Sequence, residues 1–151
     1  MKKKTSKKTK GFSLIELLIM VAIILIIAAI AIPNLLRARR SANEGSATAS
    51  MRTLGSGELL YRSTNGNFTD LAGLSADSII DNVLGSGSKS GYGFAATPGT
   101  STDLEFVATG TPSISTGATQ TGARYYRTDE TQVVRFNVGA VATSGSGAIG
   151  N

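Results

Sequence analysis

The chain has 151 residues and contains no cysteine, histidine or tryptophan. These absences exclude disulfide bonds, thiolate or imidazole metal sites, a cysteine nucleophile, a histidine-based triad and a lipid anchor attached through cysteine. The length predicts one domain of ordinary size.

The formal charge of +5 is concentrated at one end of the chain. Six lysines lie within the first ten residues, whereas residues 12–151 carry nine basic and ten acidic side chains. A short basic leader therefore accounts for the high isoelectric point, and we expect no specific nucleic-acid partner. An apolar stretch follows directly, which favours a cytoplasmic leader ahead of a membrane helix.

The apolar stretch is the strongest feature of the sequence. Leu17–Ile32 is sixteen residues without a polar side chain, and Phe12–Leu36 would measure about 37 Å as a helix. That length spans a bilayer, with the bulk of the chain on the far side. Pro33 predicts a kink, because it lacks the backbone N–H of an ordinary helical residue.

Residues 1–36 also fit two simpler interpretations, a plain signal anchor or a cleaved secretory signal. Ala29-Ile30-Ala31 matches the small-x-small cleavage pattern, which would start the mature protein at Ile32. Neither interpretation explains Glu16, since a carboxylate costs about 2.5–3.5 kcal/mol at the centre of a membrane helix and less near its end. A position of Glu16 at the membrane interface would make that cost small.

The segment Lys10-Gly11-Phe12-Ser13-Leu14-Ile15-Glu16-Leu17-Leu18-Ile19 resembles the type IV prepilin cleavage and methylation motif. The resemblance covers about residues 1–40. It implies that a prepilin peptidase cuts after Gly11, that the new N-terminal Phe12 is N-methylated and that Glu16 guides assembly. Pro33 falls where this family often has a proline.

The chemistry of this motif is physically reasonable. Gly11 has no side chain, so the peptide can enter a narrow site in extended form. Cleavage there removes the lysines but keeps the apolar helix. Glu16 lies one helical turn from the new amine of Phe12, and the two charges can pair within one subunit or between neighbours, where the pair would fix the register.

We expect the helix to continue beyond the membrane, over residues 37–63. Ala47, Met51, Leu54 and Tyr61 form an apolar stripe with helical spacing, which predicts a face packed on a core. The glycines at 45, 55 and 57 each cost about 1 kcal/mol relative to alanine. We expect loosening near Pro33 or Gly45 on assembly.

The remainder predicts a small domain, residues 64–138, with an α+β, pilin-like fold. A short helix is expected near 76–84, followed by three or four antiparallel strands packed on the helix. β-Branched and aromatic runs place these strands at 92–96, 104–109, 123–127 and 132–138, with a hairpin turn at 129–131. The Gly-, Ser- and Ala-rich segment 139–151 predicts a flexible tail.

Several patterns resemble chemical motifs but lack the spacing or density that those motifs require. The Gly/Ser-rich run 85–91 lacks the spacing of a phosphate-binding loop. The acid pairs Asp77/Asp81 and Asp103/Glu105 are too sparse for calcium, and solvated carboxylates are the simpler interpretation. We therefore predict no enzyme activity, no catalytic residue, no cofactor and no metal.

The resemblance implies a structural subunit, processed after Gly11 and polymerised into a helical pilus through its apolar helix. Its implied partners are further copies of itself, the prepilin peptidase, and an inner-membrane assembly platform with its ATPase. The precursor would lie in the bacterial inner membrane and the product in a cell-surface filament.

Two alternatives stay open. One is a pseudopilin of a type II secretion system, which would be periplasmic. The other belongs to a different class: a secreted binding domain whose signal is cleaved after Ala31.

Overall fold

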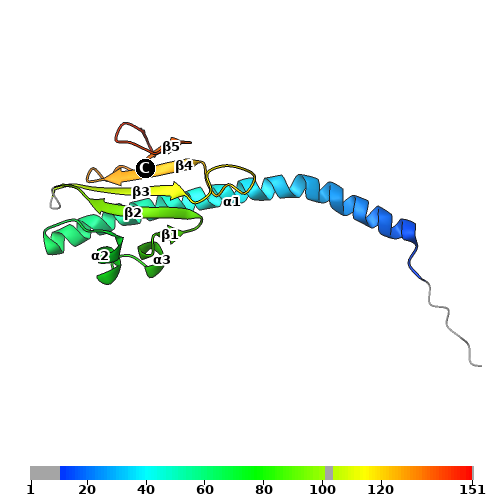
Figure 1. Ribbon diagram of the computed structural model, residues 1–151, viewed down its shortest axis with the longest axis horizontal. Helices are drawn as coiled ribbons and strands as arrows, with labels where there is room; N and C mark the ends of the chain where they lie inside the picture. Colours follow the sequence, from blue (N-terminus) through cyan, green and yellow to red (C-terminus); the bar gives the residue numbers. More distant parts are fainter. Residues whose placement is uncertain (1–10, 101–103, 151) are drawn as a thin grey trace, which may run out of the picture. The chain divides into compact units, whose positions relative to one another are not determined.

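The computed structural model describes residues 11–100 and 104–150. It divides the chain into two units, residues 1–35 and 36–151, which are described separately. Helix α1 contributes to both (Figure 1). The elements follow one another as α1 (Leu14–Asn65), α2 (Leu71–Ala76), α3 (Asn82–Gly85), β1 (Ser88–Lys89), β2 (Tyr92–Pro98), β3 (Phe106–Pro112), β4 (Arg124–Asp129), β5 (Arg135–Val138) and β6 (Gly147–Ala148).

The strands form one antiparallel sheet in chain order, β1-β2-β3-β4-β5-β6. Figure 1 shows this sheet lying along the second half of α1. The predicted α+β fold is confirmed. The sheet has six strands rather than three or four, because β1 and β6 are two-residue strands that extend its edges.

Helix α1 runs through both predicted helical segments and ends at Asn65, two residues beyond the predicted position. Gly66 follows at φ +80° and its N–H donates to the carbonyl of Arg62, 2.8 Å away. A left-handed glycine after the last turn is a common helix stop. On the domain half, the buried positions include Ala47, Met51 and Leu54, which confirms most of the predicted stripe. Tyr61 is only half buried.

Aromatic side chains fill the space between α1 and the sheet. Tyr92 of β2 and Tyr126 of β4, the strands on either side of β3, have ring centroids 5.7 Å apart. Phe68, from the turn after α1, packs on Phe106 of β3 at 4.8 Å. All four side chains are at most 1% exposed, so they anchor the core.

Two glycines in α1 allow other segments to approach the helix closely. A Cβ at position 57 would lie 3.1 Å from Ile79 Cγ2, and one at position 55 would lie 2.7 Å from Gln132 Oε1. Gln132 follows β4 and has φ +61°, an uncommon conformation for a residue other than glycine. The absence of a side chain at these two positions therefore allows Ile79 and Gln132 to contact the helix. These contacts account for glycine at positions where it lowers helix propensity.

The region between α1 and the sheet differs from the prediction. Instead of one helix near 76–84 there are two short helices, α2 before and α3 after a turn at 77–81. Asp70 and Asp81 are their N-caps and accept backbone N–H bonds from Gly73 and Leu84, both at 2.8 Å. These two carboxylates divide the region, since each starts a new helix.

Some strand limits also differ. The third strand begins at Phe106, not at residue 104, and the strand predicted at 132–138 begins only at Arg135. Residues 132–134 instead connect the β4–β5 turn to β5. Within this turn the Gln132 N–H donates to the carbonyl of Asp129. The predicted turn at 129–131 is present.

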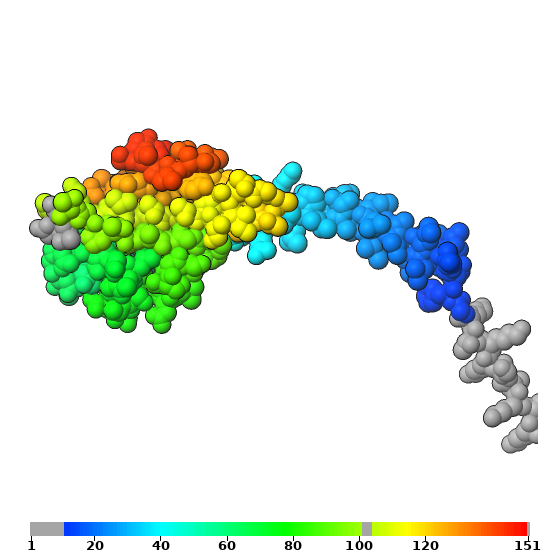
Figure 2. All heavy atoms as spheres, viewed as in Figure 1, coloured from blue at the N-terminus to red at the C-terminus, as the bar shows by residue number. Residues whose placement is uncertain are grey.

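The segment 139–151 contains a strand that was not predicted. Gly147 and Ala148 form β6 against β5, Ala142 is buried, and the Ile149 N–H donates to the carbonyl of Val134 at 2.8 Å. In the space-filling view, the residues after β5 form a ridge along one side of the domain (Figure 2). The flexibility of the tail stays a prediction.

Candidate assembly site on the N-terminal helix

The start of α1 is capped by its own Glu16. Ser13 directly precedes the helix, and its backbone N–H donates to Glu16 Oε2 at 2.9 Å. This is one half of a capping box, in which a serine at the N-cap and a glutamate three residues later satisfy free donors of the first turn. Glu16 therefore has a structural role within the chain itself.

Gly11 and Phe12 lie before this cap in a segment without regular secondary structure. A Cβ on Gly11 would have no neighbour within 4 Å, and the Phe12 side chain is 77% exposed. The peptide bond between them is thus sterically open in this chain. The predicted roles of Gly11, Phe12 and Glu16 in processing and register stay predictions.

The first half of α1 exposes nearly all of its apolar side chains. The large ones from Phe12 to Leu35 are between 46% and 82% exposed. By length and composition this helix can cross a membrane. A continuous apolar surface of this extent marks a region that another molecule or a lipid phase covers.

Pro33 lies inside α1. Because proline has no N–H, the carbonyl of Ala29 lacks the helical donor four residues later. The kink at Pro33 stays a prediction.

A polar network joins the domain half of α1 to the start of β4. Glu44 Oε1 accepts the N–H of Ala123 at 2.9 Å, and its Oε2 lies 3.6 Å from the Nε of Arg124. The hydroxyl of Tyr126 donates to the Glu44 carbonyl at 3.2 Å, while that of Tyr92 donates to the Arg124 carbonyl at 3.0 Å. Burial raises the pKa of both tyrosines, so both hydroxyls keep their protons at neutral pH.

A second acidic residue, Glu58, is completely buried in the domain. Its Oε2 accepts the N–H of Thr69 at 3.1 Å, whereas its Oε1 has no hydrogen-bond partner. Burial, with a smaller contribution from the charge of Asp70, raises the pKa of Glu58 to about 7. Glu58 was not among the predicted site residues, although its position within the predicted apolar stripe was a signal.

Asp77 and Asp81, the first acid pair considered above, have separate structural roles. Asp81 caps α3 and contacts Lys89 at 2.8 Å, and this ammonium lowers the pKa of its carboxyl. Asp77 ends α2 instead. Asp103 lies outside the described residues. Within residues 11–100 and 104–150, no three acidic side chains gather as metal ligands would.

A capped apolar helix that continues into an α+β domain with an antiparallel sheet is the architecture of a pilin-like protein. Comparison with known proteins supports this assignment. Residues 6–32 match the family model of the prokaryotic N-terminal methylation motif.

Two curated relatives are similar to the chain. The type IV wide pilus major component PilA4 of Thermus thermophilus is 46% identical over 63 residues, or 42% of this chain and 48% of that protein. The type IV major pilin protein PilA of Myxococcus xanthus is 32% identical over 136 residues, or 84% of this chain and 58% of that protein. The chain therefore matches about half the length of each relative.

The motif and these similarities together support the type IV pilin family for this chain. The sequence motif had predicted this family, and the prediction is confirmed. The capping role of Ser13 was missed, although the pattern Ser-x-x-Glu is visible in the sequence.

Proposed function

We propose that this protein is a structural subunit of a type IV pilus, assembled through the first half of α1. The observation that carries the proposal is the contrast in burial: the domain has a complete core, while the apolar side chains from Phe12 to Leu35 are exposed. Their burial against membrane lipid and then against further copies contributes about 25 cal/mol per Å². Both curated relatives are described as major pilus subunits.

In this proposal the precursor lies in the inner membrane with its lysines in the cytoplasm. A prepilin peptidase cuts after Gly11, and Phe12 becomes the N-methylated first residue. Cleavage removes six positive charges and leaves the apolar helix intact. The segment therefore remains in the membrane until the assembly platform and its ATPase add the subunit to the filament.

Glu16 has two successive partners in this account. In the single chain its carboxylate accepts the Ser13 N–H. In the filament it also pairs with the cationic amine of Phe12 of a neighbouring subunit, because an unpaired charge is costly in an apolar core. The same subunit contact, repeated without closure, generates a fibre.

The test compares the source bacterium with a deletion strain and with strains complemented by wild type or Glu16→Ala. Cell-surface filaments are sheared off, imaged and probed for this chain. We expect long filaments with wild type and none with Glu16→Ala, while the variant persists in the membrane. Loss of protein secretion in the deletion strain, with no filaments from wild-type cells, would instead identify a pseudopilin. A wild-type chain found only as a soluble protein starting at Ile32 would contradict assembly altogether.

A further inference from the structure

A row of exposed side chains runs along the domain half of α1. Arg52, Ser56, Leu60 and Thr64 follow one another at intervals of four residues, a spacing that aligns side chains along one side of a helix. All four are exposed. We refer to these four residues, with Ile79 and Asp77 beside them, as the outer strip.

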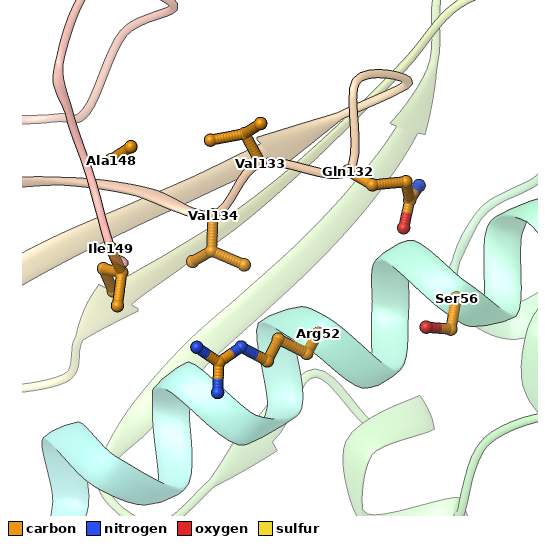
Figure 3. A pocket seen from close by; sticks show the side chains of 7 residues that line it. All are labelled: Arg52, Ser56, Gln132, Val133, Val134, Ala148 and Ile149. Carbon is orange, nitrogen blue, oxygen red and sulfur yellow. The ribbon is translucent and has the colours of Figure 1, made fainter. Parts of the chain in front are cut away.

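The Arg52 end of the outer strip lies in a hollow of about 460 Å³. Figure 3 shows the Arg52 side chain rising from α1, with Val134 and Ile149 on the facing side and Gln132 and Ser56 to one side. Its Nη2 donates to the carbonyl of Gly150 at 3.5 Å, which is a weak bond. Among the described residues no carboxylate lies within 4.0 Å of this guanidinium.

The other end of the outer strip is acidic. Asp77 borders a second hollow with Leu60, Thr64 and Ile79. Its Oδ2 accepts a long bond of 3.4 Å from Asn65 Nδ2. In the described parts of the chain, no lysine or arginine reaches Asp77. The strip is thus positive at one end, negative at the other and apolar between them, where Leu60 is 56% exposed.

These two charges are too far apart to pair within one subunit. Asn65, the neighbour of Asp77, lies thirteen residues after Arg52 on the same helix, or about 20 Å along the axis. Among the described residues, neither charge has an oppositely charged partner within 4.0 Å. A second copy supplies both, because its own outer strip carries the complementary charge.

The orientation of that second copy follows from the membrane. All copies insert with their lysines on the same side, so their α1 helices run parallel. Two parallel strips bring Asp77 of one copy to Arg52 of another only when the copies are displaced by about 20 Å along the helix. A two-fold antiparallel pairing would place the charges together as well, but it requires opposite insertion.

We propose that the outer strip binds a second copy of this chain head to tail, with Asp77 of one subunit against Arg52 of a neighbour displaced by about 20 Å. This inference rests on the proposed pilus function and specifies one of its lateral contacts. The charged pair between the two ends of the strip sets the axial displacement.

The absence of native cysteine makes this contact directly testable by crosslinking. The chain with both Arg52→Cys and Asp77→Cys is assembled in cells, sheared off, oxidised and run on a non-reducing gel. We expect a ladder of dimers, trimers and longer species, because each subunit contacts one neighbour through each end of its strip. Arg52→Cys with Glu130→Cys is the matched control, since Glu130 is an exposed residue of the β4–β5 turn outside the strip. The control is expected to give monomers.

Each other outcome has a definite meaning. Filaments that yield only monomers contradict the outer-strip contact but leave the pilus function intact. A dimer without longer species indicates a two-fold contact and also overturns the proposal. If wild-type cells form no filaments, the proposed function itself fails.

If the cysteine variants do not assemble, charge reversal tests the same pairing of Arg52 with Asp77. Arg52→Asp and Asp77→Arg are each expected to lower the amount of sheared filament at least fivefold, and their combination to restore most of it. Failure of the double variant to exceed both single variants contradicts the pairing. Equal membrane levels of all four chains show that folding is not the cause.

Discussion

The two halves of α1 belong to one helix but have opposite relations to the rest of the chain. In the first half, apolar side chains cover the surface, and no residue of the most apolar stretch is buried. In the second half, the buried positions face a core built from the sheet and from Phe68, while the opposite side is largely polar. The second half packs on a core within the domain, whereas the described apolar side chains of the first half are exposed.

This difference separates folding from assembly. Side chains such as Leu54 contribute to the stability of the domain, because they leave water when one chain folds. Side chains such as Ile24 leave water only in a membrane or among other copies. Substitutions in the two halves should therefore affect different measurements, and the following predictions test that separation from the largest effect to the smallest.

Ile24→Glu, in the middle of the apolar half, should abolish filaments. A carboxylate there costs about 2.5–3.5 kcal/mol in a bilayer and has no counter-charge in an apolar filament core. Sheared filament is quantified by immunoblot, and unfolding of the domain is followed in detergent. Ile24→Leu is the control and should assemble normally. Normal filaments from Ile24→Glu would show that this half is not buried on assembly.

Leu54→Ala should destabilise the domain by about 2–5 kcal/mol, because it leaves a cavity under a completely buried side chain. Urea denaturation of the detergent-solubilised protein measures the free energy of unfolding. Leu60→Ala, on the exposed side of the same helix, is the matched control and should change it by less than about 0.5 kcal/mol. Equal losses from the two variants would mean that the two sides of the helix are not distinct.

Glu58 should make domain stability fall as the pH rises. Its pKa is about 7 in the folded chain and 4.5 in the reference state, so its contribution is fully present below pH 4.5 and is lost as the pH rises through 7. The total change is about 3 kcal/mol. Glu58→Gln should remove this dependence and unfold at higher urea than wild type at pH 8. Glu130→Gln, at an exposed position, should keep the wild-type slope, and a Glu58→Gln slope equal to wild type would contradict the assignment.

The smallest effect is expected at the helix glycines. Gly45→Ala should stabilise the domain by about 1 kcal/mol, since a Cβ there meets no atom within 4 Å. Gly57→Ala should gain less or lose stability, because Ile79 would have to move away from the new methyl group. Urea midpoints of the two variants give the comparison. A larger gain at position 57 than at position 45 would show that the close approach of Ile79 is unimportant.

The features that could be predicted from the sequence are those that depend only on residues close together in the chain. The continuous apolar run predicted the first half of α1. The stripe of Ala47, Met51 and Leu54 predicted the buried side of the second half of the helix. The lysine leader with Gly11, Phe12 and Glu16 identified the family. The Ser13–Glu16 cap was equally local and could have been predicted.

The missed features depend on partners that are distant in sequence. Gly55 and Gly57 looked like weaknesses of the helix, because nothing local shows that Gln132 and Ile79 approach them. The two-residue strands β1 and β6 have no pattern of their own and exist through pairing with β2 and β5. The outer strip could not be predicted from the sequence either, because Asp77 comes to lie beside the end of α1 only when the chain folds.

The central claim is that the apolar half of α1 is kept after processing and is the part by which the subunit assembles. The most direct test is the mass of the N-terminal peptide of the mature protein, determined in membrane and sheared-surface fractions. The account predicts an N-methylated Phe12 in both fractions. A mature N-terminus at Ile32 would contradict it, because the chain would then have lost its apolar half. An unprocessed Met1 in the sheared filaments would equally contradict cleavage after Gly11.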